Sequence, residues 1–181
     1  ATGRRSDLMV NQYEDEKALS IYTVIDKSRV MKMPFGGLSL LDYAINTSLV
    51  LSNVALNRQD KAGLVTFSDK PNTILPADRG RLQLRKILDA LYKEKERFVE
   101  ANYELLYMAL RNNIKSRSLL VFFTNFESSY ALQRVLPLLR KINQKHLLVV
   151  VFFENTEVDS LAAPHPTPTM EEVYTQAIAQ K

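Results

Sequence analysis

Oxygen-bearing side chains follow each of four apolar runs, at the points where the runs end. These polar segments are Asp26-Lys27-Ser28, Ser68-Asp69, Thr124-Asn125 and Glu154-Asn155. Carboxylate, hydroxyl and amide oxygens are the ligands that a hard cation such as Mg²⁺ prefers, about six of them at roughly 2.1 Å. A plainer interpretation stays open, because loops at strand ends turn into solvent and are polar for that reason. The residue types therefore allow a metal or binding site without requiring one.

The apolar runs predict strands that would bring these polar segments together. They are short, rich in β-branched and aromatic residues, and continuous rather than alternating, which is typical of parallel strands buried on both faces. The runs cover residues 21–25, 63–67, 119–123 and 147–153, and residues 72–75 could add an antiparallel arm. In an open α/β sheet, ligands bind outside the carboxyl ends of the strands, which is where the polar segments should gather.

Apolar residues at helical spacing fill the gaps between the predicted strands. The pattern predicts helices over residues 39–57, around 84–91 and 103–110, and from residue 128 onward, where Pro137 should break or kink the helix. Strands that alternate with helices predict a doubly wound α/β domain, with a mostly parallel sheet and helices on both faces.

The 181 residues suit a single domain. We expect a lead-in at 1–18, a core at 19–154, a proline-rich loop at 155–169 and an incomplete helix at 170–181, whose start Thr169 and Glu172 mark as a capping box.

Composition excludes several classes of chemistry. The chain has no cysteine, which removes disulfides, thiolate nucleophiles and zinc–thiolate sites, and it has only two histidines. The net charge of +4 permits nucleic-acid binding, but glutamates interrupt the basic residues and no aromatic side chains align with them. We therefore expect solvated helical surfaces and no nucleic-acid partner. No apolar run approaches the roughly 20 residues of a membrane helix, so we expect no membrane contact by this chain.

The run from Ile25 to Met31 resembles the metal-site loop of von Willebrand factor type A domains, Asp-x-Ser-x-Ser after the first strand. Further segments occur in the same order as in the bacterial von Willebrand-like family catalogued as domain of unknown function fifty-eight. The resemblance covers nearly the whole chain and rests on residues 9–16, 42–44, 60–68, 99–104 and 117–125.

This resemblance implies a fold and a mode of action. Von Willebrand type A domains are interaction modules, in which serines, a threonine and aspartates hold a divalent ion and a partner supplies a carboxylate. Members of the bacterial family often lie beside MoxR-type AAA+ ATPases. They are typically anchored by upstream membrane helices, which implies a location on the cytoplasmic side. Similar proteins continue past Lys181 into another strand and helix, so the sheet would be truncated before its last strand and could pair with a second copy through its edge.

Only part of the family's metal site is matched in this sequence. Asp26 and Ser28 match, but the second serine is replaced by Val30 and the expected aspartate by Asn125. One negative charge remains where the full site has two, and affinity for hard cations rises with the number of charged ligands. We therefore expect weak or absent Mg²⁺ or Mn²⁺ binding, with Asp26, Ser28 and Asn125 as the remaining ligands.

The sequence is best interpreted as a non-catalytic protein-binding domain, with a MoxR-type ATPase as the implied partner. The expected binding residues lie on the carboxyl-end rim and are Asp26, Ser28, Arg29, Asn102, Thr124 and Asn125. The alternative is a metal-dependent phosphotransfer or hydrolytic enzyme that uses Asp26 as its nucleophile, although the usual second acid two residues later is missing. A serine hydrolase is disfavoured because neither histidine is placed to act on a serine.

Overall fold

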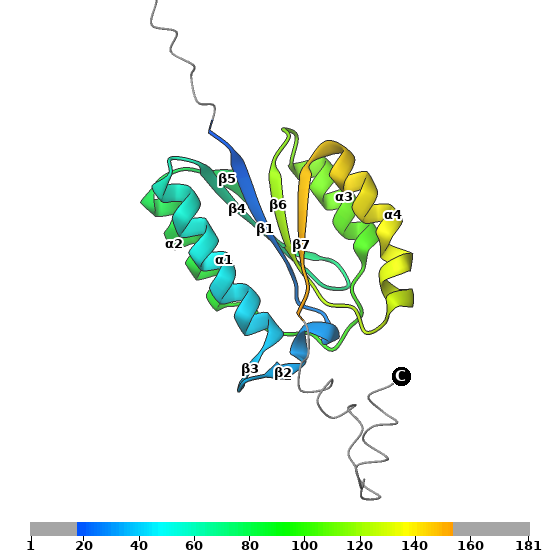
Figure 1. Ribbon diagram of the computed structural model, residues 1–181. Helices are drawn as coiled ribbons and strands as arrows, with labels where there is room; N and C mark the ends of the chain where they lie inside the picture. Colours follow the sequence, from blue (N-terminus) through cyan, green and yellow to red (C-terminus); the bar gives the residue numbers. More distant parts are fainter. Residues whose placement is uncertain (1–17, 154–181) are drawn as a thin grey trace, which may run out of the picture.

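The computed structural model describes residues 18–153, which form a five-stranded sheet between two pairs of helices (Figure 1). The strand order is β5-β4-β1-β6-β7, and all neighbouring strands are parallel except β4 and β5. The strands are β1 Ser20–Asp26, β4 Lys61–Phe67, β5 Pro71–Asp78, β6 Leu119–Phe123 and β7 Leu147–Val151. The four predicted strands and the antiparallel arm are all confirmed, and the arm is longer than predicted.

Two helices cover each face of the sheet, which confirms the doubly wound α/β fold (Figure 1). Helices α1 (Leu40–Asn57) and α2 (Arg81–Tyr92) contact one face, and α3 (Tyr103–Asn113) and α4 (Ser129–Lys145) the other. Successive residues of a strand point to opposite faces. On β1, for example, Ile25 therefore packs with α1 and α2, while Val24 packs with α3 and α4.

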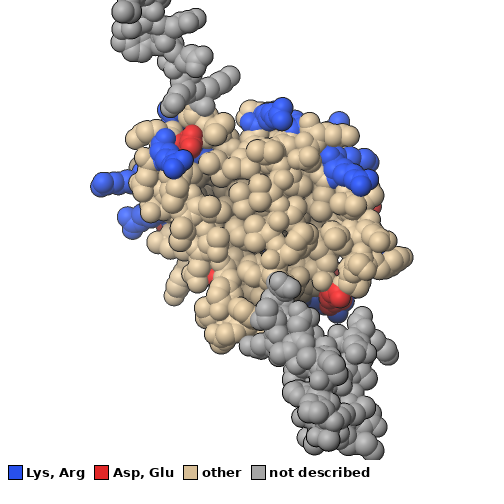
Figure 2. Space-filling view, viewed as in Figure 1, with Lys and Arg blue, Asp and Glu red and all other residues tan. Residues whose placement is uncertain are grey.

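The strand β7 corrects the prediction that all four apolar runs are buried on both faces. Leu147 and Val149 are 55% and 44% exposed, because none of the described helices covers β7 on the side of α1 and α2. Figure 2 shows the molecule from the β7 edge of the sheet, where few charged residues lie in the middle of the view. The strand also ends at Val151, two residues before the apolar run does.

Pro137 does not break α4, which runs without interruption from Ser129 to Lys145. Proline removes one helical hydrogen bond, but Pro137 is exposed, so water can reach the freed carbonyl group. Burial of Leu139 and Ile142 beyond the proline holds the second half of the helix against the sheet.

The connection from β1 to α1 is built from short, locally specified pieces. It contains the 3₁₀ helix η1 (Arg29–Lys32) and a hairpin of β2 (Pro34–Phe35) and β3 (Leu38–Ser39). Gly36 and Gly37 form the hairpin turn with φ angles of +56° and +85°, which glycine adopts without strain. Ser39 and Asp42 then form a reciprocal capping box that starts α1.

No helix within residues 18–153 is both long and apolar enough to span a bilayer. The expectations for the lead-in, the proline-rich loop and the last helix concern residues outside the described part of the chain.

Candidate functional site

Asp26, the last residue of β1, is completely buried and holds both of its carboxylate oxygens in hydrogen bonds. Oδ1 accepts from the backbone N–H of Ser28 at 2.8 Å, and Oδ2 accepts from the hydroxyl of Thr124 at 2.8 Å. The hydroxyl of Tyr103 donates to the same Oδ2 at 3.4 Å. Burial raises the pKa of Asp26 above its ordinary value, and the hydrogen bond from the Ser28 backbone N–H only partly offsets this.

Three separate elements bring this group together. Thr124 directly follows β6, which pairs with β1 in parallel, so the two strands end at the same edge. Tyr103 is the first residue of α3, and its ring packs edge-on against Phe67 and Phe122. The Tyr103 hydroxyl lies 3.0 Å from that of Thr124. Burial, together with the charge of Asp26, raises the pKa of Tyr103, so the phenol stays protonated and can donate.

Few side-chain oxygens next to Asp26 are left without a hydrogen-bond partner in the described part of the chain. Asp26 already accepts from three donors, and Val30 offers no oxygen where the family pattern has its second serine. The Ser28 hydroxyl is buried without a hydrogen-bond partner among the described residues, so it is a single spare ligand. Residues 18–153 contain no group of three His, Cys, Asp or Glu side chains that could hold a metal. A hard cation would need several further oxygens.

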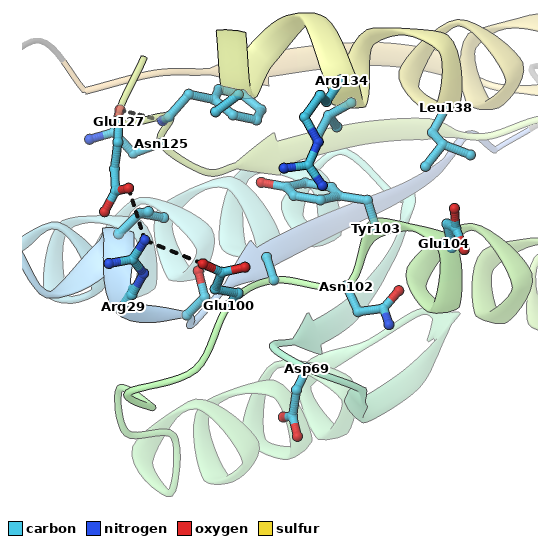
Figure 3. Close-up of a pocket in the computed structure, with 16 residues that line it drawn as sticks. Arg29, Asp69, Glu100, Asn102, Tyr103, Glu104, Asn125, Glu127, Arg134 and Leu138 are labelled. Carbon is cyan, nitrogen blue, oxygen red and sulfur yellow. Dashed lines mark hydrogen bonds and ion pairs between the residues drawn. The ribbon is translucent and has the colours of Figure 1, made fainter. Parts of the chain in front are cut away.

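Above the buried group, Arg29 bridges two loops at the mouth of a cleft (Figure 3). Its guanidinium lies 3.0 Å from a carboxylate oxygen of Glu127 and 3.4 Å from one of Glu100. The Arg29 side chain is 45% exposed and both glutamates are more so, which means that solvent screens these ion pairs. The bridge is therefore a weak contact that a competing ion can displace.

The cleft has a volume of about 540 Å³ and lies at the carboxyl ends of the strands, between the start of α3 and the first half of α4. This volume is within the range of binding pockets in proteins, roughly 300–1,000 Å³. Half-buried apolar side chains supply much of its lining, and they include Val30, Ala101, Phe126, Ala131, Val135 and Leu138. Charged residues stand around the rim and are Arg29, Asp69, Glu100, Glu104, Glu127 and Arg134.

A second buried polar group anchors the loop beneath the cleft from the other side. Lys27 forms a buried ion pair with Glu94, whose second oxygen accepts from the hydroxyls of Thr66 and Thr73 at 2.7 and 2.8 Å. Burial by itself would raise the pKa of Glu94, but the hydrogen bonds from Lys27, Thr66 and Thr73 and the charge of Lys27 outweigh it. The net effect lowers the pKa.

The structure separates the six predicted binding residues into two layers. Ser28, Arg29, Asn102 and Asn125 line the cleft, although the side-chain oxygens of both asparagines already accept from backbone N–H groups of Leu105 and Phe126. Asp26 and Thr124 have no exposed surface and lie beneath the cleft, outside its lining. Of the three predicted metal ligands, Asp26 and Ser28 are therefore adjacent, while the amide oxygen of Asn125 is engaged elsewhere.

Sequence reasoning missed Tyr103 and the α4 wall as parts of this site. Tyr103 lies in the helix expected around residues 103–110; its ring packs against Phe67, and its hydroxyl also completes the Asp26 group. Ala131, Arg134, Val135 and Leu138 recur at helical spacing, and this stripe lines the cleft. The helical spacing can be read from the sequence, but the sequence does not show that this stripe faces the start of α3 across the cleft.

Comparison with known proteins identifies the family and the fold. The family model described as "Protein of unknown function DUF58" matches residues 1–161. No curated protein matches the chain. Among solved structures, an aerotolerance-related membrane protein from Bacteroides fragilis, with multiple mutations to serines, aligns with a TM-score of 0.53 at 15% identity over 74% of this chain.

Two further solved structures show the same fold. The VWA domain of SpRpn10 aligns with a TM-score of 0.53 at 12% identity, covering 91% of this chain and 83% of that one. The conserved hypothetical protein BatB from Bacteroides thetaiotaomicron aligns at 0.51 and 14% identity over 74% of this chain. The chain spans 66% of the Bacteroides fragilis protein and 65% of BatB. These likenesses establish a von Willebrand type A-like fold.

Proposed function

The chain belongs to the DUF58 family, and from this membership and the geometry of the cleft we propose that it is a non-catalytic module that binds another protein. One observation carries the proposal: an open, partly apolar cleft lies over a fully buried Asp26, and an exposed arginine stands at its mouth. Arg29 supplies the positive charge that a divalent ion supplies in the typical family site. A carboxylate of the partner would replace Glu127 or Glu100 on its guanidinium.

The same geometry disfavours the alternative of a phosphotransfer or hydrolytic enzyme that uses Asp26. A phosphotransfer nucleophile must reach its substrate, whereas Asp26 has no exposed surface and shares its oxygens among three donors. The burial that raises the Asp26 pKa also makes the carboxylate harder to ionise and less available to a metal. We therefore propose weak or no binding of Mg²⁺ or Mn²⁺ and no turnover.

We propose a MoxR-type AAA+ ATPase as the partner, with this chain as its adaptor or substrate-presenting subunit. We also propose that the parent protein is membrane-anchored, with this domain on the cytoplasmic side. The Bacteroides fragilis structure is described as a membrane protein, which supports an anchored parent for this fold. The edge of β7 is unpaired among the described strands, which supports a second, weaker mode in which two copies associate through that edge.

Binding of the purified chain to a purified MoxR-type ATPase from the same organism tests the proposal. Surface plasmon resonance should show saturable binding that Arg29→Glu weakens about tenfold, because a charge-assisted contact is lost and repulsion is added. Arg58→Glu is the matched control, since Arg58 is an exposed arginine just after α1 and away from the cleft.

No binding, or binding that both variants leave unchanged, would refute the proposed partner surface. Hydrolysis of p-nitrophenyl phosphate by the wild type that disappears in Asp26→Asn would establish the enzyme instead.

A further inference from the structure

The two arginines that line the cleft differ in their partners. Arg29 is held by Glu100 and Glu127, whereas Arg134 has no ion pair or hydrogen bond within the described part of the chain. In Figure 3 the Arg134 side chain extends from α4 toward Tyr103, which also lines the cleft. A positive charge over a partly apolar cleft favours a ligand that brings a negative charge.

The wall that carries Arg134 is otherwise apolar. Ala131, Val135 and Leu138 follow the i, i+4, i+7 spacing of one helical face and are half-buried, and Arg134 lies on the same face. Phe126 continues this apolar surface beyond the start of α4, and its ring stacks on Tyr103 with centroids 5.9 Å apart. Burial of an apolar ligand side chain against such a surface is favourable by about 25 cal/mol per Å².

The opposite wall limits how much negative charge the ligand can carry. Glu104 stands on α3 and has no ion pair within residues 18–153, and Asp69 is held by Arg97 at 3.2 Å. A ligand that is acidic along its length would meet these carboxylates. A single carboxylate flanked by apolar residues meets less of this repulsion and can still pair with Arg134.

From these contacts we propose that the cleft binds a peptide segment in which apolar side chains flank one carboxylate, with Arg134 as the residue that recognises the acid. The inference rests on the proposed protein-binding function and adds the chemistry of the ligand. The apolar side chains lie against Val135, Leu138 and Phe126, and the carboxylate accepts from the Arg134 guanidinium. Arg29 remains at the mouth, where it can take a second acidic group of the partner.

Short peptides of defined sequence test this inference with the full chain. The probe is acetyl-Ser-Leu-Leu-Asp-Leu-Ser-amide, and its matched versions replace Asp by Lys or every Leu by Ser. In ¹⁵N–¹H NMR titrations, the Asp peptide should shift the backbone resonances of Tyr103 and of the α4 residues Ala131, Arg134, Val135 and Leu138 in a saturable way. The Lys peptide and the Ser peptide should bind more weakly, each by about fivefold or more.

Reversing the charge of Arg134 tests whether this residue recognises the carboxylate of the peptide. Arg134→Glu should weaken the Asp peptide about tenfold and improve binding of the Lys peptide, because the favoured ligand charge is inverted. Arg140→Glu is the matched control, because Arg140 is an exposed arginine on the same helix that does not line the cleft, and it should change neither affinity.

Three results would overturn the inference: equal binding of the Asp and Lys peptides by the wild type, no response at the cleft to any peptide, or equal effects of the Arg134 and Arg140 variants. These results are distinct from failure of the proposed function. Arg29-dependent binding of the ATPase without peptide binding refutes the ligand chemistry only, whereas peptide binding without ATPase binding refutes the proposed partner only.

Discussion

The hydroxyl of Tyr103 lies 3.4 Å from Oδ2 of Asp26, although the two residues are 77 positions apart in the sequence. It also lies 3.0 Å from the hydroxyl of Thr124, which itself donates to the same carboxylate oxygen at 2.8 Å. Two hydroxyl groups therefore lie at the same buried oxygen of Asp26, one from the start of α3 and one from the end of β6.

We expect Tyr103→Phe to destabilise the domain by about 1 kcal/mol, because the variant keeps the ring packing and loses a hydrogen bond to a buried acceptor. Denaturant unfolding followed by circular dichroism at neutral pH measures the change. Tyr107→Phe is the control, since Tyr107 lies one turn along the same helix and its hydroxyl takes no part in the Asp26 group. Equal stability losses in the two variants would contradict the role given to the Tyr103 hydroxyl.

The pH dependence of stability should report the buried state of Asp26. Because burial raises its pKa in the folded protein, the folded state binds the proton more tightly than the unfolded state does. This contribution to stability is fully present below the unfolded pKa and is lost as the pH rises through the folded pKa.

The wild type should therefore gain stability relative to Asp26→Asn as the pH falls from 7 toward 4. Urea unfolding of both proteins across this range gives the difference and cancels the titration of other groups. A difference that stays flat, or that moves in the opposite direction, would show that the Asp26 pKa is not raised.

Isothermal titration calorimetry with MgCl₂ and MnCl₂ should show no binding tighter than about millimolar, because a single charged ligand attracts hard cations weakly. The Asp26→Ala variant should give the same baseline as the wild type. Saturable heat in the wild type that the substitution abolishes would mean that other oxygens complete the site, and that the charge argument from Val30 and Asn125 fails.

Loss of the buried ion pair between Lys27 and Glu94 should destabilise the domain more than loss of a surface ion pair. Lys27→Met should cost about 3 kcal/mol in the free energy of unfolding, because Glu94 would stay buried without its cation. The double variant Lys27→Met, Glu94→Gln should recover part of this loss, since the remaining amide can still bond to Thr66 and Thr73.

Lys70→Met, at an exposed lysine, is the control and should stay within about 0.5 kcal/mol of the wild type. Because the Glu94 pKa is lowered, the contribution of the pair is present above the ordinary glutamate pKa and is lost as the pH falls through the folded pKa. A loss in Lys27→Met no greater than that in Lys70→Met would contradict the buried pair.

The predicted fold and the observed fold agree where local sequence is strongly biased. The strands β1, β4 and β6 are central and buried on both faces, so their sequences carry continuous apolar residues that mark them clearly. The strand at β7 was also predicted, but its burial on both faces was not observed, because Leu147 and Val149 are exposed although the sequence is equally apolar. The break considered at Pro137 does not occur either, because an exposed position tolerates the missing hydrogen bond. Both errors arise because burial depends on neighbours that the local pattern does not specify.

The sequence by itself determined the alternation of strands and helices, and with it the edge at which Asp26, Ser28, Thr124 and Asn125 gather. It did so because parallel strands joined by right-handed crossovers must all end at the same edge. Only the tertiary structure decided which of these side chains reach solvent. The Tyr103 hydroxyl closes over Asp26, and α4 places Arg134 above the cleft. Both depend on how α3 and α4 pack against the sheet, and packing is set by contacts between residues that are far apart in the chain.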